Sequence, residues 1–121
     1  MDLKTIRDTT HFSPEKMQKV NLFASRNMFC DIYCLEPGQL QKVHRHNGND
    51  KIYYVIEGTG KFTVGKDVQI LQAGQIVCAF SGEPHGVENT SQQRLVCLVF
   101  MAPNPSREGT IDLAEREEQY S

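Results

Sequence analysis

The chain has 121 residues, a net charge of −2, and 39% apolar and 23% charged residues, which are ordinary values for one globular domain. The near-neutral charge excludes nucleic-acid binding by bulk electrostatics, because a basic face is needed to displace the counterions of phosphates. No apolar run approaches the roughly 20 residues of a membrane helix. The first residues lack the apolar segment of a signal peptide, so we expect a cytoplasmic protein with neither a membrane nor a nucleic-acid partner.

In chain order, residues 1–27 are predicted to be an N-terminal arm, in which Ser13-Pro14-Glu15 is typical of the start of a short helix. Turn residues then separate the expected strands, which span 28–35, 39–46, 51–57, 61–64, 68–71, 76–80, 85–88 and 93–101. Residues 28–102 are therefore expected to form one barrel domain. Residues 103–121 hold more acidic than basic side chains, and we expect a flexible, solvated acidic tail there.

The strand pattern indicates the fold class. Short strands that follow one another with glycine and proline turns are typical of an all-β sandwich or barrel. No segment between them is long enough to be the helix of a β-α-β crossover. The sequence therefore predicts an all-β domain.

The cysteines lie mostly in apolar runs. Cys78 and Cys97 are flanked by valine, isoleucine, leucine and phenylalanine, and Cys30 follows Met28-Phe29. Their spacing fits neither a Cys-x-x-Cys motif nor a zinc finger, and free cysteine behaves as a small buried apolar residue. We therefore expect buried, reduced thiols at Cys30, Cys34, Cys78 and Cys97.

The histidines are spaced differently. His44 and His46 are separated by one residue, so on a strand both imidazoles would lie on the same face. His85 follows a Gly-Glu-Pro loop two strands later. Imidazole is a common ligand of zinc, iron, copper and nickel, so the three residues are candidate metal ligands.

These histidines fall into two motifs that resemble those of the cupin family. Residues 38–58, which contain His44 and His46, resemble the first motif, and residues 74–89, which contain His85, resemble the second. The resemblance covers about residues 28–101. It implies a double-stranded β-helix or jelly-roll barrel with a metal inside, held by the three histidines. It also implies a homodimer, often formed by exchange of an N-terminal strand.

One position departs from the cupin pattern. The first motif usually carries a glutamate ligand seven residues before its closing glycine, where this chain has Lys51. A protonated lysine has no lone pair for a metal. Lys51 would lie behind the ion, its pKa lowered by the metal or its charge paired with a carboxylate such as Asp50. Tyr53 shares its strand parity with Lys51, so both are expected to line the ligand pocket.

The sequence leaves several functions open. In the first, His44, His46 and His85 hold a divalent transition metal (zinc, iron, nickel or manganese) and leave positions for a small polar or anionic ligand, with oxygenase- or isomerase-type chemistry. In the second, the barrel is metal-free, and Lys51 anchors a sugar or a carboxylate. In the third, the histidines only pack inside the barrel. A barrel does not by itself name a reaction, so the sequence does not decide whether the protein is an enzyme.

Overall fold

The computed structural model describes residues 1–105, so the predicted tail lies outside the described residues apart from its first positions. The described part contains one 3-10 helix, η1 (Ile6–Asp8), and nine strands. The strands are β1 (Gln18–Ala24), β2 (Phe29–Leu35), β3 (Leu40–His44), β4 (Asp50–Glu57), β5 (Thr59–Val64), β6 (Asp67–Gln72), β7 (Ile76–Ala79), β8 (His85–Glu88) and β9 (Leu95–Ala102). No helix in residues 1–105 is long and apolar enough to cross a membrane.

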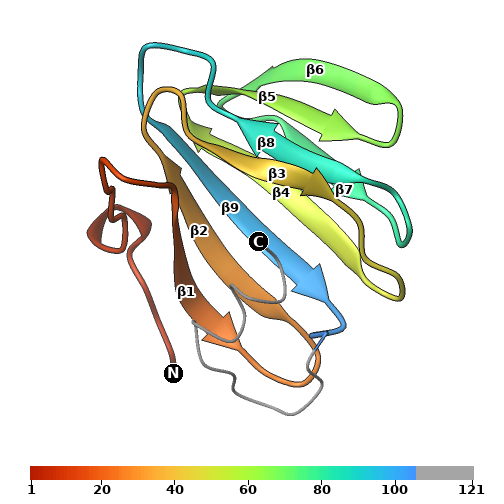
Figure 1. Cartoon of the computed structure of the whole chain (residues 1–121). Coiled ribbons are helices and arrows are strands. Elements are labelled where there is room, and N and C mark those ends of the chain that lie inside the picture. The colour runs from red at the N-terminus through yellow and green to blue at the C-terminus, as the bar shows by residue number, and fades with distance from the viewer. Residues whose placement is uncertain (106–121) are drawn as a thin grey trace.

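The strands form two antiparallel sheets that lie one over the other (Figure 1). One sheet has five strands in the order β1-β2-β9-β4-β7, and the other has four in the order β3-β8-β5-β6. Neighbours in the sheets are mostly distant in sequence, as in a jelly roll. The structure therefore confirms the predicted all-β fold of the double-stranded β-helix type.

The core lies between the two sheets. In β4, Lys51, Tyr53 and Val55 are buried while the alternate residues are only half-buried, which is the two-residue period expected of a sheet with one covered face. The main apolar cluster joins inward side chains of both sheets, from Tyr33 and Val99 to Phe62 and Val87. This alternation confirms the predicted inward placement of Lys51 and Tyr53.

The N-terminal arm differs from the prediction in two ways. The helix expected at Ser13 is wrong: residues 14–16 form a bend, and the only helical turn of the described arm is η1. Residues 18–24 instead form β1, which pairs antiparallel with β2. Val20 and Leu22 pack with Ile32 of β2, so tertiary packing decides the conformation of a segment with a weak local pattern.

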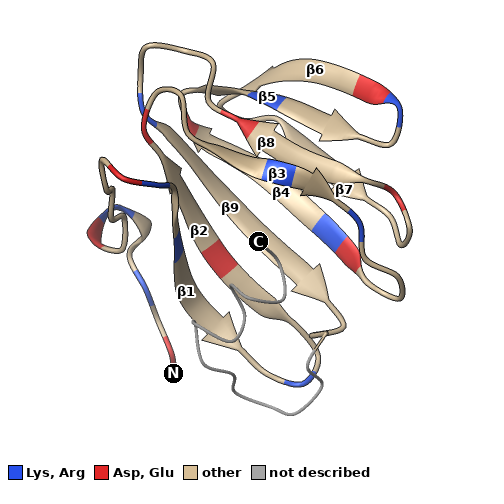
Figure 2. Ribbon diagram, viewed as in Figure 1, with Lys and Arg blue, Asp and Glu red and all other residues tan. Residues whose placement is uncertain are grey.

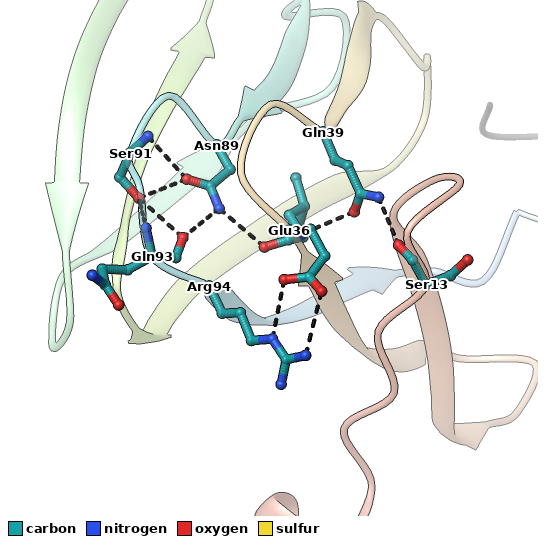
Figure 3. Close-up of polar contacts among 8 residues, drawn as sticks. Ser13, Glu36, Gln39, Asn89, Ser91, Gln93 and Arg94 are labelled. Carbon is teal, nitrogen blue, oxygen red and sulfur yellow. Dashed lines mark hydrogen bonds and ion pairs between the residues drawn. The ribbon is translucent and has the colours of Figure 1, made fainter.

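Polar contacts fasten the arm to the turn between β2 and β3 (Figure 3). Gln39 Nε2 donates to the Ser13 carbonyl at 2.7 Å, and Gln39 Oε1 accepts from the Glu36 amide at 2.8 Å. Arg94 pairs with the Glu36 carboxylate and lies 4.2 Å from the centroid of the Phe12 ring. The arm therefore rests against the outer side of the five-stranded sheet.

Two motif residues have structural roles. Gly58 has a φ of +80° where the chain passes from β4 in one sheet to β5 in the other, and a Cβ there would collide with the Arg94 carbonyl oxygen. Asn89 is fully buried, and its Nδ2 donates to the carbonyls of Leu35 at 3.0 Å and Gln93 at 2.8 Å (Figure 3). Asn89 thus holds the loop before β9.

Two of the cysteines are where the sequence analysis expects them. Cys34 and Cys97 are buried, and burial raises the pKa of the Cys97 thiol to about 12. Cys30 and Cys78 are only half-buried, so the prediction of burial is wrong for this pair. Both lie on the outward side of the five-stranded sheet, because each pairs in register with an outward residue of the neighbouring strand.

Candidate metal centre

The structure brings together the three predicted histidines. His44 ends β3 and pairs in register with His85, which begins β8. The ring centroids of His44 and His85 lie 4.6 Å apart, and those of His44 and His46 lie 4.8 Å apart. One nitrogen from each ring lies within 4.8 Å of the others, so the rings converge on one point.

The backbone that carries the first two histidines is not the predicted strand. A strand is predicted over residues 39–46, but β3 ends at His44 and its register shifts between Gln41 and His44. His46 lies in the following loop. The side chains therefore meet through a bulge and a loop rather than through strand alternation.

The histidine rings are oriented by backbone carbonyls. The Nδ1 atom of His44 lies 2.7 Å from the Lys42 carbonyl, and that of His85 lies 3.0 Å from the Glu83 carbonyl. A carbonyl only accepts, so each Nδ1 carries the proton and the Nε2 of the neutral ring keeps its lone pair. The three Nε2 atoms are buried, and those of His44 and His85 have no hydrogen-bond partner among residues 1–105.

The electrostatics keep the rings neutral. Burial lowers the pKa of all three histidines, to about 4 for His46 and about 3 for His85. The positive charge of Lys51 acts in the same direction. Buried, neutral imidazoles with unsatisfied lone pairs are the form that binds a divalent transition metal, so the donor set fits such an ion.

Lys51 lies in a polar group inside the barrel. It is 1% exposed, and its Nζ donates to Gln41 Oε1 at 3.3 Å. Tyr53 donates from its hydroxyl to the same oxygen at 3.0 Å, and Gln41 Nε2 donates to the Tyr33 hydroxyl at 3.1 Å. Nζ also lies 5.3 Å and 5.0 Å from the ring centroids of Tyr33 and Tyr53.

The charge environment of Lys51 differs from the expectation. Burial, followed by the charge of Lys19, holds the pKa of Lys51 well below its usual range, while Asp31 opposes this shift. Asp50 is not the partner, because it is exposed and its Oδ1 accepts from the Ser81 amide at 2.9 Å. Pairing of Lys51 with Asp50 is therefore wrong, and the nearby carboxylate that favours the charged amine is Asp31.

Gln41 and Tyr33 are members of this group that the sequence analysis does not identify. Gln41 is 5% exposed and accepts hydrogen bonds from both Lys51 and Tyr53. On a regular strand it would face away from His44, three residues later, and only the bulge in β3 brings both to the interior. Tyr33 lies in no sequence motif that would identify it as a member of this group.

Comparison with known families agrees with the geometry. A family model described as the cupin domain matches residues 31–101, more than half of the chain. The chain belongs to the cupin family. The match spans β2 to β9 and includes all three histidines.

The chain is also similar to individual proteins and solved structures. The chain is 44% identical over 68 residues to a Thermotoga maritima protein named oxalate-binding protein, covering 55% of each chain, so it spans about half the length of that relative. A crystal structure of a Thermus thermophilus protein superposes with a TM-score of 0.83 at 43% identity, covering 85% of this chain and 98% of that one. A Thermotoga maritima structure described as a predicted oxalate decarboxylase has a TM-score of 0.69 at 26% identity, covering 73% and 81%.

Proposed function

We propose that this cupin domain binds a divalent transition-metal ion through His44, His46 and His85. The observation that carries the proposal is the convergence of three buried Nε2 atoms, two of them without hydrogen-bond partners in residues 1–105. Imidazole nitrogens suit zinc, iron and nickel, and three protein ligands leave coordination positions for water or a ligand. A bound ion would act as a Lewis acid toward that ligand.

We further propose that the ligand is a small carboxylate held by Lys51 and Tyr53. The named relative binds oxalate, and Lys51 supplies an amine inside the same barrel. Gln41 Oε1 fixes the positions of Nζ and of the Tyr53 hydroxyl. An incoming anion would favour the protonated amine and offset its burial, which makes Lys51 a carboxylate anchor.

A second candidate is a metal-free carboxylate- or sugar-binding protein. It is favoured by Lys51 itself, which stands where the cupin motif usually carries a glutamate ligand and which is fully buried. In this case the histidines would contact the ligand directly. A metal-loaded protein can be assayed for consumption of oxalate, and the metal-free protein can be assayed for binding of oxalate and of sugars.

The deciding experiment is metal analysis of protein purified without a histidine tag. We expect close to one equivalent of a transition metal after reconstitution, and at least about a 100-fold loss of affinity in His85→Ala. His11→Ala is the matched control, because His11 is exposed and lies outside the three-histidine cluster. Less than about a tenth of an equivalent in the wild type would refute the metal proposal and leave the metal-free one.

Calorimetry with oxalate tests the ligand. Binding to metal-loaded protein that is lost in both Lys51→Met and metal-free protein would support the complete site. Binding that needs Lys51 but no metal would support the second candidate.

The cytoplasmic location and the domain boundaries expected from the sequence stay predictions.

A further inference from the structure

A second lysine lies on the inner face of the five-stranded sheet. Lys19 in β1 pairs in register with Tyr33 of β2, and Tyr33 pairs in turn with the buried Cys97 of β9. Partners in register point to the same face of an antiparallel sheet, so Lys19 shares the inner face with Tyr33. Its neighbour Val20 packs on the outward side with Ile32. Lys19 is therefore an inward residue of the barrel.

The amines of Lys19 and Lys51 lie near the same aromatic ring. Lys19 Nζ is 5.8 Å from the centroid of the Tyr33 ring, and Lys51 Nζ is 5.3 Å from it. The Tyr33 hydroxyl accepts from Gln41 Nε2, and Gln41 Oε1 accepts from Lys51. Lys19 thus extends the buried polar group around Lys51 toward β1, the edge strand of the sheet.

The two lysines differ in their access to solvent. Lys51 is 1% exposed, whereas Lys19 is half-buried. Lys19 is also the only charged residue of β1, as Figure 2 shows. A half-buried lysine lays its aliphatic stem along neighbouring rings and keeps its charged end near water. Lys19 therefore places a cation between the solvent and the buried amine.

The charge of Lys19 acts on the groups of the proposed site. For Lys51, burial is the largest influence that lowers the pKa, the charge of Lys19 is the second, and Asp31 opposes both. For His46, burial and the charges of His44 and Lys51 lower the pKa, and Lys19 adds to them. Charges interact more strongly across a protein interior than across water. Lys19 therefore contributes to the potential that an anion meets at the three histidines.

We infer that Lys19 makes the site selective for dicarboxylates over monocarboxylates, and this inference rests on the proposed carboxylate ligand. Asp31, the acidic group that acts on Lys51, neutralises only one of the two amines when both are charged. A divalent ion on three neutral imidazoles would add two further positive charges. A dianion loses more hydration than a monoanion on entering the barrel, so only a site with several cations can prefer it. Lys19 supplies one of these cations.

The test is calorimetry of the full chain with two acids of similar size. Oxalate carries two carboxylates, and glycolate has a hydroxymethyl group in place of one of them. We expect Lys19→Met to weaken oxalate binding at least about tenfold and glycolate binding less than about threefold. Lys19→Arg keeps the charge and should stay within about threefold of the wild type for both acids. The comparison uses whichever form binds oxalate, metal-loaded or metal-free.

Lys61→Met is the matched control, because it removes the same charge from an exposed position of β5 that pairs with Glu88 on the other sheet. It should leave both affinities unchanged. Metal content, measured in parallel, should be equal in all variants. A loss for oxalate in Lys61→Met as large as in Lys19→Met would overturn the inference, because net charge alone would then explain the effect.

The salt dependence gives a second readout. Screening weakens exposed charges more than buried ones, so raising the salt from about 20 mM to about 300 mM should weaken oxalate binding more in the wild type than in Lys19→Met. Equal salt dependence in the two proteins would overturn the inference.

The remaining outcomes separate this inference from the proposed function. Oxalate binding in Lys19→Met as tight as in the wild type would overturn the role of Lys19 and leave the proposed site intact. An equal loss for oxalate and glycolate would also overturn it, because Lys19 would then support the structure of the site rather than recognise the second charge. A wild type that binds neither acid would refute the carboxylate ligand itself, and this inference with it.

Discussion

The two faces of the five-stranded sheet each carry some residues that are unusual for their surroundings. The inner face, which lines the barrel, holds Asp31, Tyr33, Lys51 and Tyr53, each at 2% exposure or less. The outer face holds Tyr54, which is half-buried, beside Ile76, which is 63% exposed. Polar side chains are therefore buried among the apolar residues of the inner face, and apolar side chains are exposed on part of the outer face.

Both arrangements cost free energy in an isolated chain. Buried polar groups are unfavourable unless they are hydrogen-bonded, and exposed apolar area is unfavourable in water. Within the barrel, Gln41 satisfies only part of the bonding capacity of the Lys51 ammonium, which has three donors. On the inside, the metal and the carboxylate proposed above would offset this cost.

The strongest test of this contrast uses adjacent residues of β9. Val99 faces inward and is fully buried, whereas Phe100 is half-buried on the outward side of the sheet. Val99→Asp would bury an isolated carboxylate and should destabilise the fold by more than about 4 kcal/mol, enough to prevent folding of a typical domain. Phe100→Asp should stay folded and lose less than about 2 kcal/mol.

Urea unfolding followed by circular dichroism measures both variants. If Phe100→Asp were as unstable as Val99→Asp, Phe100 and the outward side of the sheet around it would belong to the core. The distinction between the two faces would then be wrong.

The next largest effect is expected at Gln41. Gln41→Leu removes the acceptor shared by Lys51 and Tyr53 and the donor to Tyr33, and should cost about 3 kcal/mol because buried polar groups lose their partners. Gln69→Leu, on an exposed position of β6, should change the free energy of unfolding by less than about 0.5 kcal/mol. If Gln41→Leu and the wild type unfolded at the same urea concentration, the buried Lys51 and Tyr53 would not need the acceptor that Gln41 provides.

The strands that form the barrel were predictable from the sequence because glycine and proline mark their ends. The loop at residues 82–84 separates β7 from β8, and the turn at residues 37–38 separates β2 from β3. β1 was not predictable in this way, since its burial depends on contacts with β2 and with the arm rather than on its own pattern.

The site was predictable in part for the same kind of reason. The histidine motif pointed to His44, His46 and His85, although the strand geometry expected for them is wrong. The motif carries no information about the bulge in β3, which reverses the direction of the side chains after Gln41. Gln41 was therefore not predicted as a site residue. The sequence suggested Asp50 as a partner of Lys51, but the carboxylate that raises the pKa of Lys51 is Asp31, on a different strand.

A smaller effect, of opposite sign, is expected at Lys51. In metal-free protein at pH 7, Lys51→Met should raise the free energy of unfolding by about 2 kcal/mol, since an apolar side chain of similar length replaces a buried amine. Gln41 Oε1 would still accept from Tyr53, so no acceptor is orphaned. A Lys51→Met variant less stable than wild type would show that the amine has a stabilising partner.

The pH dependence sharpens this prediction. The pKa of Lys51 is lowered in the folded protein from its ordinary value of 10.5, so the unfolded chain binds more protons below that pH. The contribution of Lys51 to the free energy of unfolding of the wild type should therefore rise as the pH increases toward 10.5 and fall as the pH is lowered. Lys51→Met lacks this contribution, so the gap between the two proteins in urea should close as the pH approaches 10.5.

The smallest effect concerns the part of the outer face that the arm covers. Phe12 is half-buried, packs with the cluster on the outward side of β2 and β9, and lies beneath the Arg94 guanidinium. Phe12→Ala should cost about 1 kcal/mol, less than a fully buried aromatic, because Gln39 still holds the arm at Ser13. His11→Ala, at an exposed neighbour, should be neutral. A loss above about 3 kcal/mol in Phe12→Ala would mean that the arm covers a true core on β2 and β9, and the exposed apolar surface would then be confined to β4 and β7.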